Sequence, residues 1–143
     1  MAKVSVVYWS QTGNTEAMAE AIAEGARTAG AEVVLTPVSK VNKTDVLSSD
    51  VIALGCPSMG VETLEEMEFD PFFADIESSL SGRKVALFGS YGWGDGQWMR
   101  DWESRTTAAG AIIYQGEGFI VNETPGNAEL AKAKEIGAGL ASF

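Results

Sequence analysis

Residues 10–15 read Ser10-Gln11-Thr12-Gly13-Asn14-Thr15 and stand between an apolar stretch, residues 4–9, and a stretch of helical character, residues 15–29. Apolar side chains in the second stretch recur at intervals of about 3.6 positions, which predicts that the hexapeptide ends a strand and opens a helix. Amides at a helix N-terminus lack partners within the helix and carry partial positive charge, so a phosphate group binds well there. Gly13 allows the backbone to approach such a group closely.

The surroundings of this hexapeptide narrow the kind of phosphate that it would bind. Neither Lys nor Arg occurs between Lys3 and Arg27. A phosphate would therefore be held by backbone amides and by the serine and threonine hydroxyls of the hexapeptide, which favours a phosphate monoester over a triphosphate with its metal ion. The alternative is an ordinary strand-to-helix turn in which Asn14 or Thr12 caps the helix.

Strand-like and helix-like stretches alternate along the whole chain, which is typical of a doubly wound α/β domain. Short apolar runs predict parallel strands covered on both faces at residues 4–9, 32–36, 51–55, 84–89 and 111–115. Helices are predicted at residues 15–29, 44–48, 71–80, 96–109 and 127–140. We therefore expect one three-layer domain over residues 1–143, with its ligand at the carboxyl ends of the first, third and fourth strands.

Composition excludes several classes of function. The chain has 143 residues, 45% of them hydrophobic, and contains no His and a single Cys, Cys56. Histidine-based catalytic triads, the common metal sites and an internal disulfide are thereby excluded. A net charge of −10 disfavours nucleic acid and anionic membranes, and favours either a partner with a basic surface or simple solubility. Because no apolar run is long enough for a membrane span or a signal peptide, we expect a cytoplasmic protein.

Two further loops carry residues suited to binding a flat aromatic group. The loop after the third strand contains Cys56-Pro57-Ser58-Met59-Gly60-Val61-Glu62, which includes a polarizable thioether, a flexible glycine and a carboxylate. The loop after the fourth strand is rich in glycine and holds Tyr91 and Trp93. Trp93 and Met59 are suited to stack on the two faces of a flat ligand. In the alternative, these two side chains pack on each other or cover a strand end.

Three blocks of sequence resemble the flavodoxin family, specifically its short-chain bacterial members. They are Tyr-Trp-Ser-Gln-Thr-Gly-Asn-Thr-Glu at 8–16, Leu-Gly-Cys-Pro-Ser-Met-Gly at 54–60 and Phe-Gly-Ser-Tyr-Gly-Trp-Gly-Asp-Gly at 88–96, and the resemblance covers essentially the whole chain. It implies a five-stranded parallel sheet in the order 2-1-3-4-5 and one non-covalently bound FMN. The residues that it implies for FMN binding are Ser10, Gln11, Thr12, Gly13, Asn14, Thr15, Pro57, Ser58, Met59, Gly60, Val61, Glu62, Ser90, Tyr91, Gly92, Trp93 and Gly94.

The resemblance also implies a role for particular residues. Residues 10–15 would bind the phosphate, Met59 would lie on the inner face of the flavin ring and Trp93 on its outer face. Glu62 would accept the N3 proton, and the carbonyl of Gly60 would accept the N5 proton of the one-electron-reduced flavin.

The implied function is that of a low-potential one-electron carrier, not an enzyme. Such a protein shuttles electrons between redox proteins and cycles mainly between the semiquinone and hydroquinone of FMN. The alternative is an FMN-binding regulatory or interaction module without carrier turnover. The implied partners are redox proteins with basic docking surfaces, namely reductases and oxidoreductases that also use ferredoxin, and a monomer is expected.

Val61 stands in the turn Met59-Gly60-Val61-Glu62, where a β-branched residue resists positive φ. A type II′ turn needs positive φ at its second residue, where Gly60 complies. Val61 is therefore expected to bias the turn toward the form in which, by the resemblance, the Gly60 carbonyl faces N5.

Acidic residues follow this turn and also stand beside Trp93, at Asp95. They would disfavour negative charge on the reduced flavin and so lower the potential of that step. In the alternative, the carboxylates at 65–68 simply form the solvated start of a helix. The acidic residues at and after the turn are Glu62, Glu65, Glu66, Glu68 and Asp70.

The positions of five further residues near these loops are predicted less closely. Cys56 and Trp98 are expected to be packing residues, and Trp9 is expected at the border of the site. The resemblance places Asn122 and Glu123 beside the ribityl chain.

Overall fold

The apolar stretches form the strands of one parallel sheet in a computed structural model, which describes residues 2–143. The strand order is β2-β1-β3-β4-β5, with a further segment, β6, that also pairs with β4. Val4 of β1 is in register with Val33 on one side and Val51 on the other, so β1 lies inside the sheet. The predicted fold class and strand order are confirmed. The strands are β1 Lys3–Tyr8, β2 Glu32–Pro37, β3 Val51–Gly55, β4 Lys84–Tyr91, β5 Ile112–Ile113 and β6 Phe119–Asn122.

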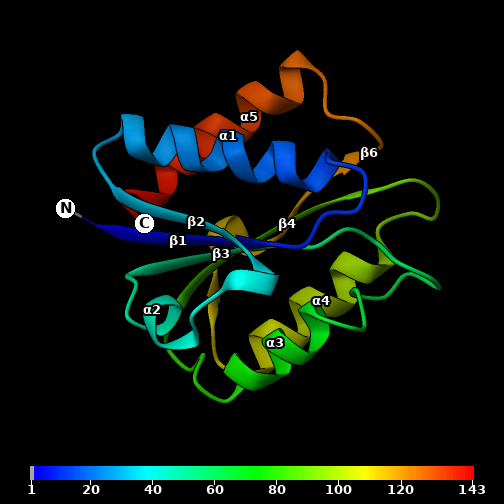
Figure 1. The fold of residues 1–143 in the computed structure, drawn as a ribbon, viewed down its shortest axis with the longest axis horizontal. Coiled ribbons are helices and arrows are strands. Elements are labelled where there is room, and N and C mark those ends of the chain that lie inside the picture. Colours follow the sequence, from blue (N-terminus) through cyan, green and yellow to red (C-terminus); the bar gives the residue numbers. More distant parts are fainter. Residues whose placement is uncertain (1) are drawn as a thin grey trace.

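Helices cover both faces of this sheet. Figure 1 shows α1 and α5 on one face, and α3 and α4 on the other. The helices are α1 Asn14–Thr28, α2 Lys43–Leu47, α3 Phe69–Glu77, α4 Gln97–Ala108 and α5 Asn127–Leu140. Short 3₁₀ segments lie at Val38–Lys40 and Tyr114–Gly116. None of the helices within the described residues is long and apolar enough to cross a membrane.

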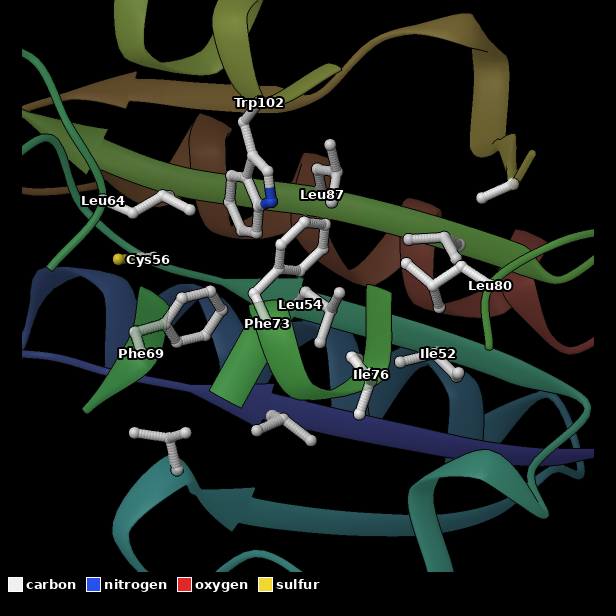
Figure 2. Close-up of a cluster of buried hydrophobic side chains, with 14 of the residues drawn as sticks. Ile52, Leu54, Cys56, Leu64, Phe69, Phe73, Ile76, Leu80, Leu87 and Trp102 are labelled. Atoms are coloured by element: carbon white, nitrogen blue, oxygen red, sulfur yellow. The ribbon is translucent and has the colours of Figure 1, made fainter. Parts of the chain in front are cut away.

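Each face of the sheet has its own core because side chains alternate along a strand. Val6 packs with Met18 and Ile22 under α1 and α5, whereas the neighbouring Val7 packs with residues of α3 and α4. In the second core (Figure 2), the ring of Trp102 meets those of Phe69 and Phe73 edge-on, with centroids 5.4 and 5.9 Å apart.

Cys56 and Trp98 are both packing residues of the second core, as predicted. Cys56 is fully buried and Trp98 is only 1% exposed. Burial raises the pKa of the Cys56 thiol, which therefore stays protonated at physiological pH.

The predicted fifth strand, residues 111–115, is wrong in its extent. Only Ile112 and Ile113 pair with β4 there, and the chain then turns away through Gln115 and Gly116, whose φ angles are +59° and +78°. Pairing resumes at Phe119 in β6, which the sequence did not indicate. A cavity of about 510 Å³ lies at this break, between α4 and α5, away from the strand-end loops considered below.

Several predicted element ends are also shifted by a few residues. The first strand ends at Tyr8, the third helix begins earlier than predicted, at Phe69, and β4 runs on to Tyr91. These shifts move no element to another layer of the fold.

Candidate functional site

Backbone hydrogen bonds join the loops that follow β1, β3, β4 and β6. The amide of Trp9 donates to the carbonyl of Gly55 at 3.0 Å, and the amide of Ser58 donates to the carbonyl of Ser90 at 3.0 Å. The amide of Glu123 donates to the carbonyl of Tyr91 at 2.7 Å. The loops after β1, β3 and β4 therefore meet at one end of the sheet, as the parallel topology predicts (Figure 1).

The loop that opens α1 is organised by Ser10. Its hydroxyl accepts hydrogen bonds from the amides of Gly13 and Glu16, each at 3.2 Å. Gly13 is the N-cap and has a φ of +94°, so the alternative in which Asn14 or Thr12 caps this helix is wrong. Only glycine adopts such a backbone conformation without strain.

Tyr8 fixes the same region from the end of β1. Its hydroxyl donates to the Glu16 carboxylate at 3.0 Å. Burial, followed by the hydrogen bond to Glu16, raises the pKa of Tyr8 to about 12. The phenol therefore remains a donor at neutral pH and holds the side chain of Glu16 in place.

Four amides between Gln11 and Thr15 are left for a ligand. Within residues 2–143, the backbone amides of Gln11, Thr12, Asn14 and Thr15 have no hydrogen-bond partner. The side chain of Thr15 is only 1% exposed, and its hydroxyl lies 3.0 Å from that of Ser90. This donor set, which consists of neutral N–H groups at a helix N-terminus, fits the phosphate monoester of FMN.

A cavity of about 460 Å³ extends from this loop, a size that suits a small organic ligand. Its lining joins four loops that lie far apart in the sequence, those at the ends of β1, β3, β4 and β6. Of the predicted site residues, Ser10, Gln11, Thr12, Asn14, Thr15, Pro57, Ser58, Met59, Ser90, Tyr91 and Gly92 line this cavity.

The other predicted residues lie outside the lining: Gly13, Gly60, Val61, Glu62, Trp93 and Gly94. Trp93 is 64% exposed on the glycine-rich loop, whereas Tyr91 packs on Trp98 with ring centroids 5.5 Å apart and faces the cavity. Glu62 accepts a hydrogen bond from the amide of Gln97 at 3.1 Å. Its carboxylate therefore caps the start of α4.

The turn after β3 closes one residue later than expected. Met59 and Thr63 exchange two backbone hydrogen bonds, of 2.8 and 2.9 Å, so the loop is a short hairpin. Gly60 has a φ of +53°, as predicted, and Glu62 also has a positive φ, of +54°. Val61 avoids the left-handed region and points to solvent, being 82% exposed.

For the FMN that the resemblance implies, we expect Val61→Gly to lower the midpoint potential of the first one-electron reduction by roughly 20–40 mV. The valine has little else to contact, so its effect comes from restricting the backbone of the turn. Glycine releases that restriction and weakens any preference for one orientation of the Gly60 carbonyl. Spectroelectrochemistry measures the potential, and Val61→Ala is the control because alanine keeps a Cβ, which still disfavours positive φ. An unchanged or higher potential for Val61→Gly would contradict the hypothesis.

Sequence reasoning missed one residue of the cavity lining, Thr124, and misjudged the burial of one carboxylate, that of Glu65. Thr124 lines the cavity beside Glu123; both follow β6, a strand that the sequence did not indicate. Glu65 is not part of a solvated helix start, because it is only 6% exposed and its carboxylate accepts from backbone amides. Trp9 is half-buried and directly precedes the loop of residues 10–15. Its indole donates a hydrogen bond to the Glu68 carboxylate at 3.3 Å.

Comparison with known proteins agrees with this geometry. The family model described as Flavodoxin matches residues 6–137. The chain is 51% identical over 126 residues to a flavodoxin of Clostridium beijerinckii, covering 88% of this chain and 91% of that one. It is 50% identical over 138 residues to a flavodoxin of Megasphaera elsdenii, covering 96% and 98%. The solution structure of two-electron reduced Megasphaera elsdenii flavodoxin superimposes with a TM-score of 0.89 at 49% identity, covering 98% and 99% of the two chains.

Proposed function

Because the chain belongs to the flavodoxin family, whose members are FMN-binding, low-potential electron carriers and not enzymes, we propose that it holds FMN in the cavity between the loops after β1, β3 and β4. Bound FMN supplies one-electron redox chemistry. The amides of residues 11–15 hold the phosphate, and Met59 and Tyr91 border the ring end of the cavity. The observation that carries this placement is the set of four unpartnered amides at the start of α1.

Trp93 and Glu62 complete the ring end in this proposal. Trp93 stands on the loop beside Gly92, a lining residue, and its indole is free to cover a flat group at the cavity mouth. Glu62 lies against Gly94 of the same loop and caps α4, so its carboxylate joins the two loops that border the ring.

The same end of the molecule is suited to docking redox proteins. Val61, Met67 and Trp93 are 82%, 84% and 64% exposed, and together they form what we term the loop face. Carboxylates adjoin these residues in the sequence, at Glu66 and Glu68 on either side of Met67 and at Asp95, which pairs with Arg100, in a chain whose net charge is −10. We propose that this face receives basic surfaces of reductases and of oxidoreductases that also use ferredoxin. A small apolar contact within an acidic surround favours fast, reversible association.

The protein is proposed to act as a monomer in the cytoplasm. Its single cysteine, Cys56, is a buried free thiol and cannot form an internal disulfide, so folding needs no oxidising compartment.

Three measurements test this function. Apoprotein mixed with FMN is expected to quench flavin fluorescence at a 1:1 ratio, and anaerobic stepwise titration with a reductant is expected to resolve two one-electron steps. Electron transfer from the reduced protein to a basic acceptor, such as a cytochrome c, should slow as ionic strength rises because opposite charges attract. Reduction of a neutral quinone is the control and should not depend on salt. Failure to take up FMN would overturn the proposed site, and a rate that rises with salt would overturn the proposed docking charge.

A further inference from the structure

We infer that Glu65 is a positioning residue for the ring end of the site: its buried carboxylate fixes the loop of residues 57–68, and thereby the placement of Met59 and Glu62. The inference rests on the proposed function, because it concerns how strongly FMN is held. Glu65 lies outside the cavity lining, so it acts only through the residues that it holds.

The carboxylate of Glu65 accepts three backbone hydrogen bonds. One oxygen accepts from the amide of Met67 at 2.8 Å, and the other accepts from the amides of Glu68 and Phe69, each at 2.8 Å. The residue is only 6% exposed. A buried carboxylate is costly unless it is hydrogen-bonded, and three short bonds from N–H groups supply that compensation at the start of α3.

The backbone of Glu65 extends the same network in both directions. Its amide donates to the sulfur of Cys56 at 3.4 Å, and its carbonyl accepts from the amide of Asp70 at 2.8 Å. The carbonyl of Cys56 in turn accepts from the indole of Trp98 at 3.1 Å. Glu65 therefore joins the end of β3, the start of α3 and, through Cys56, the helix α4.

The hairpin that carries Met59 lies between the two points that Glu65 joins. It leaves β3 after Cys56 and returns at Thr63, two residues before Glu65. With both ends of this segment fixed, the hairpin has few alternative positions. Without the carboxylate, the buried amide of Phe69 and the partly buried amides of Met67 and Glu68 lose their acceptor, and this segment must rearrange.

Variants of Glu65 and Glu66 separate the effect of loop placement on FMN binding from the effect of negative charge. Glu66 is adjacent and exposed, and within residues 2–143 its side chain makes no hydrogen bond. Glu66→Gln removes one negative charge and leaves the network intact. Glu65→Asp keeps the charge but is too short by one methylene to reach all three amides. Glu65→Gln removes the charge and places an NH₂ group where an acceptor is needed.

The experiment measures the dissociation constant of FMN and of riboflavin for the four proteins at 25 °C, after far-UV circular dichroism has shown that each apoprotein is folded. If Glu65 positions the ring end, Glu65→Asp and Glu65→Gln both bind FMN roughly tenfold or more weakly. Riboflavin binding should fall by the same factor, because the phosphate loop is untouched. The visible circular dichroism of bound flavin should also change in both variants. Glu66→Gln should bind FMN as tightly as the parent, or slightly more tightly since FMN is an anion.

Three results would overturn the inference. If Glu65→Asp and Glu65→Gln bind FMN like the parent and only melt at lower temperature, Glu65 stabilises the start of α3 and does no more. If Glu65→Gln and Glu66→Gln change binding equally while Glu65→Asp does not, charge alone is responsible. If the parent protein itself takes up no FMN, the proposed function falls, and this inference with it.

Discussion

Apoprotein is expected to bind riboflavin at least about a hundredfold more weakly than FMN, because riboflavin lacks the phosphate. The amides of Gln11, Thr12, Asn14 and Thr15 have no partner within residues 2–143. Hydrogen bonds to a charged acceptor contribute about 1.5–3 kcal/mol each, so two of them already account for this difference. Fluorescence quenching at matched ionic strength measures both dissociation constants.

Inorganic phosphate and one variant serve as controls for this result. Phosphate should compete with FMN but not with riboflavin, since it occupies only the loop that opens α1. Ser10→Ala removes the acceptor of the Gly13 and Glu16 amides and loosens the loop, so the ratio between the two dissociation constants should shrink. Equal affinity for riboflavin and FMN in the parent would show that the loop does not hold the phosphate.

Gly137→Ala is expected to destabilise the protein by about 3 kcal/mol or more, the upper end of the usual cost of overpacking. A Cβ at Gly137 would lie 1.9 Å from the carbonyl oxygen of Ile22, and a Cβ at Gly25 would lie 2.0 Å from that of Lys134. Both obstacles are backbone atoms, so α1 and α5 would have to move apart. Urea unfolding of the apoprotein, followed by far-UV circular dichroism, measures the free energy of unfolding.

Gly139→Ala is the matched control for this prediction. It lies in the same helix and gains the same intrinsic helix propensity of about 1 kcal/mol. The atoms that its Cβ would meet are the hydroxyl and two ring carbons of Tyr114, which belong to a half-buried side chain and can shift more readily than backbone. We expect its stability to stay within about 1 kcal/mol of the parent. If both variants lose stability equally, the close approach of α1 and α5 is not what Gly137 permits.

Features that depend on neighbouring residues could be predicted from the sequence. The apolar runs indicated the central strands β1, β3 and β4 because these are buried on both faces, and the alternation with helices indicated the layer arrangement. The strand order was implied by the family resemblance. Residues 10–15 indicated a phosphate loop because strand, polar turn and helix follow one another directly. The start of α5 at Asn127 and its end at Leu140 were also predicted correctly, since a periodic helical pattern marks them.

Features that depend on contacts between distant residues were decided by the tertiary structure. The fifth strand is broken because Gln115 and Gly116 adopt positive φ while Glu103 of α4 accepts the amide of Gly118 at 2.7 Å. Glu65 is of a residue type that usually lies at the surface, but it is buried because the start of α3 presents three amides to its carboxylate.

The amino-acid sequence by itself therefore determined the layer arrangement, because periodicity and local turn chemistry are recorded between neighbours. It also determined the strand order, the family and most cavity-lining residues, through the resemblance of three sequence blocks to flavodoxins. Only the tertiary structure decided that Tyr91 faces the cavity while Trp93 stands exposed, and that Glu62 caps α4. The physical reason is that a side chain's surroundings are set by which elements pack against it, and those elements lie tens of residues away along the chain.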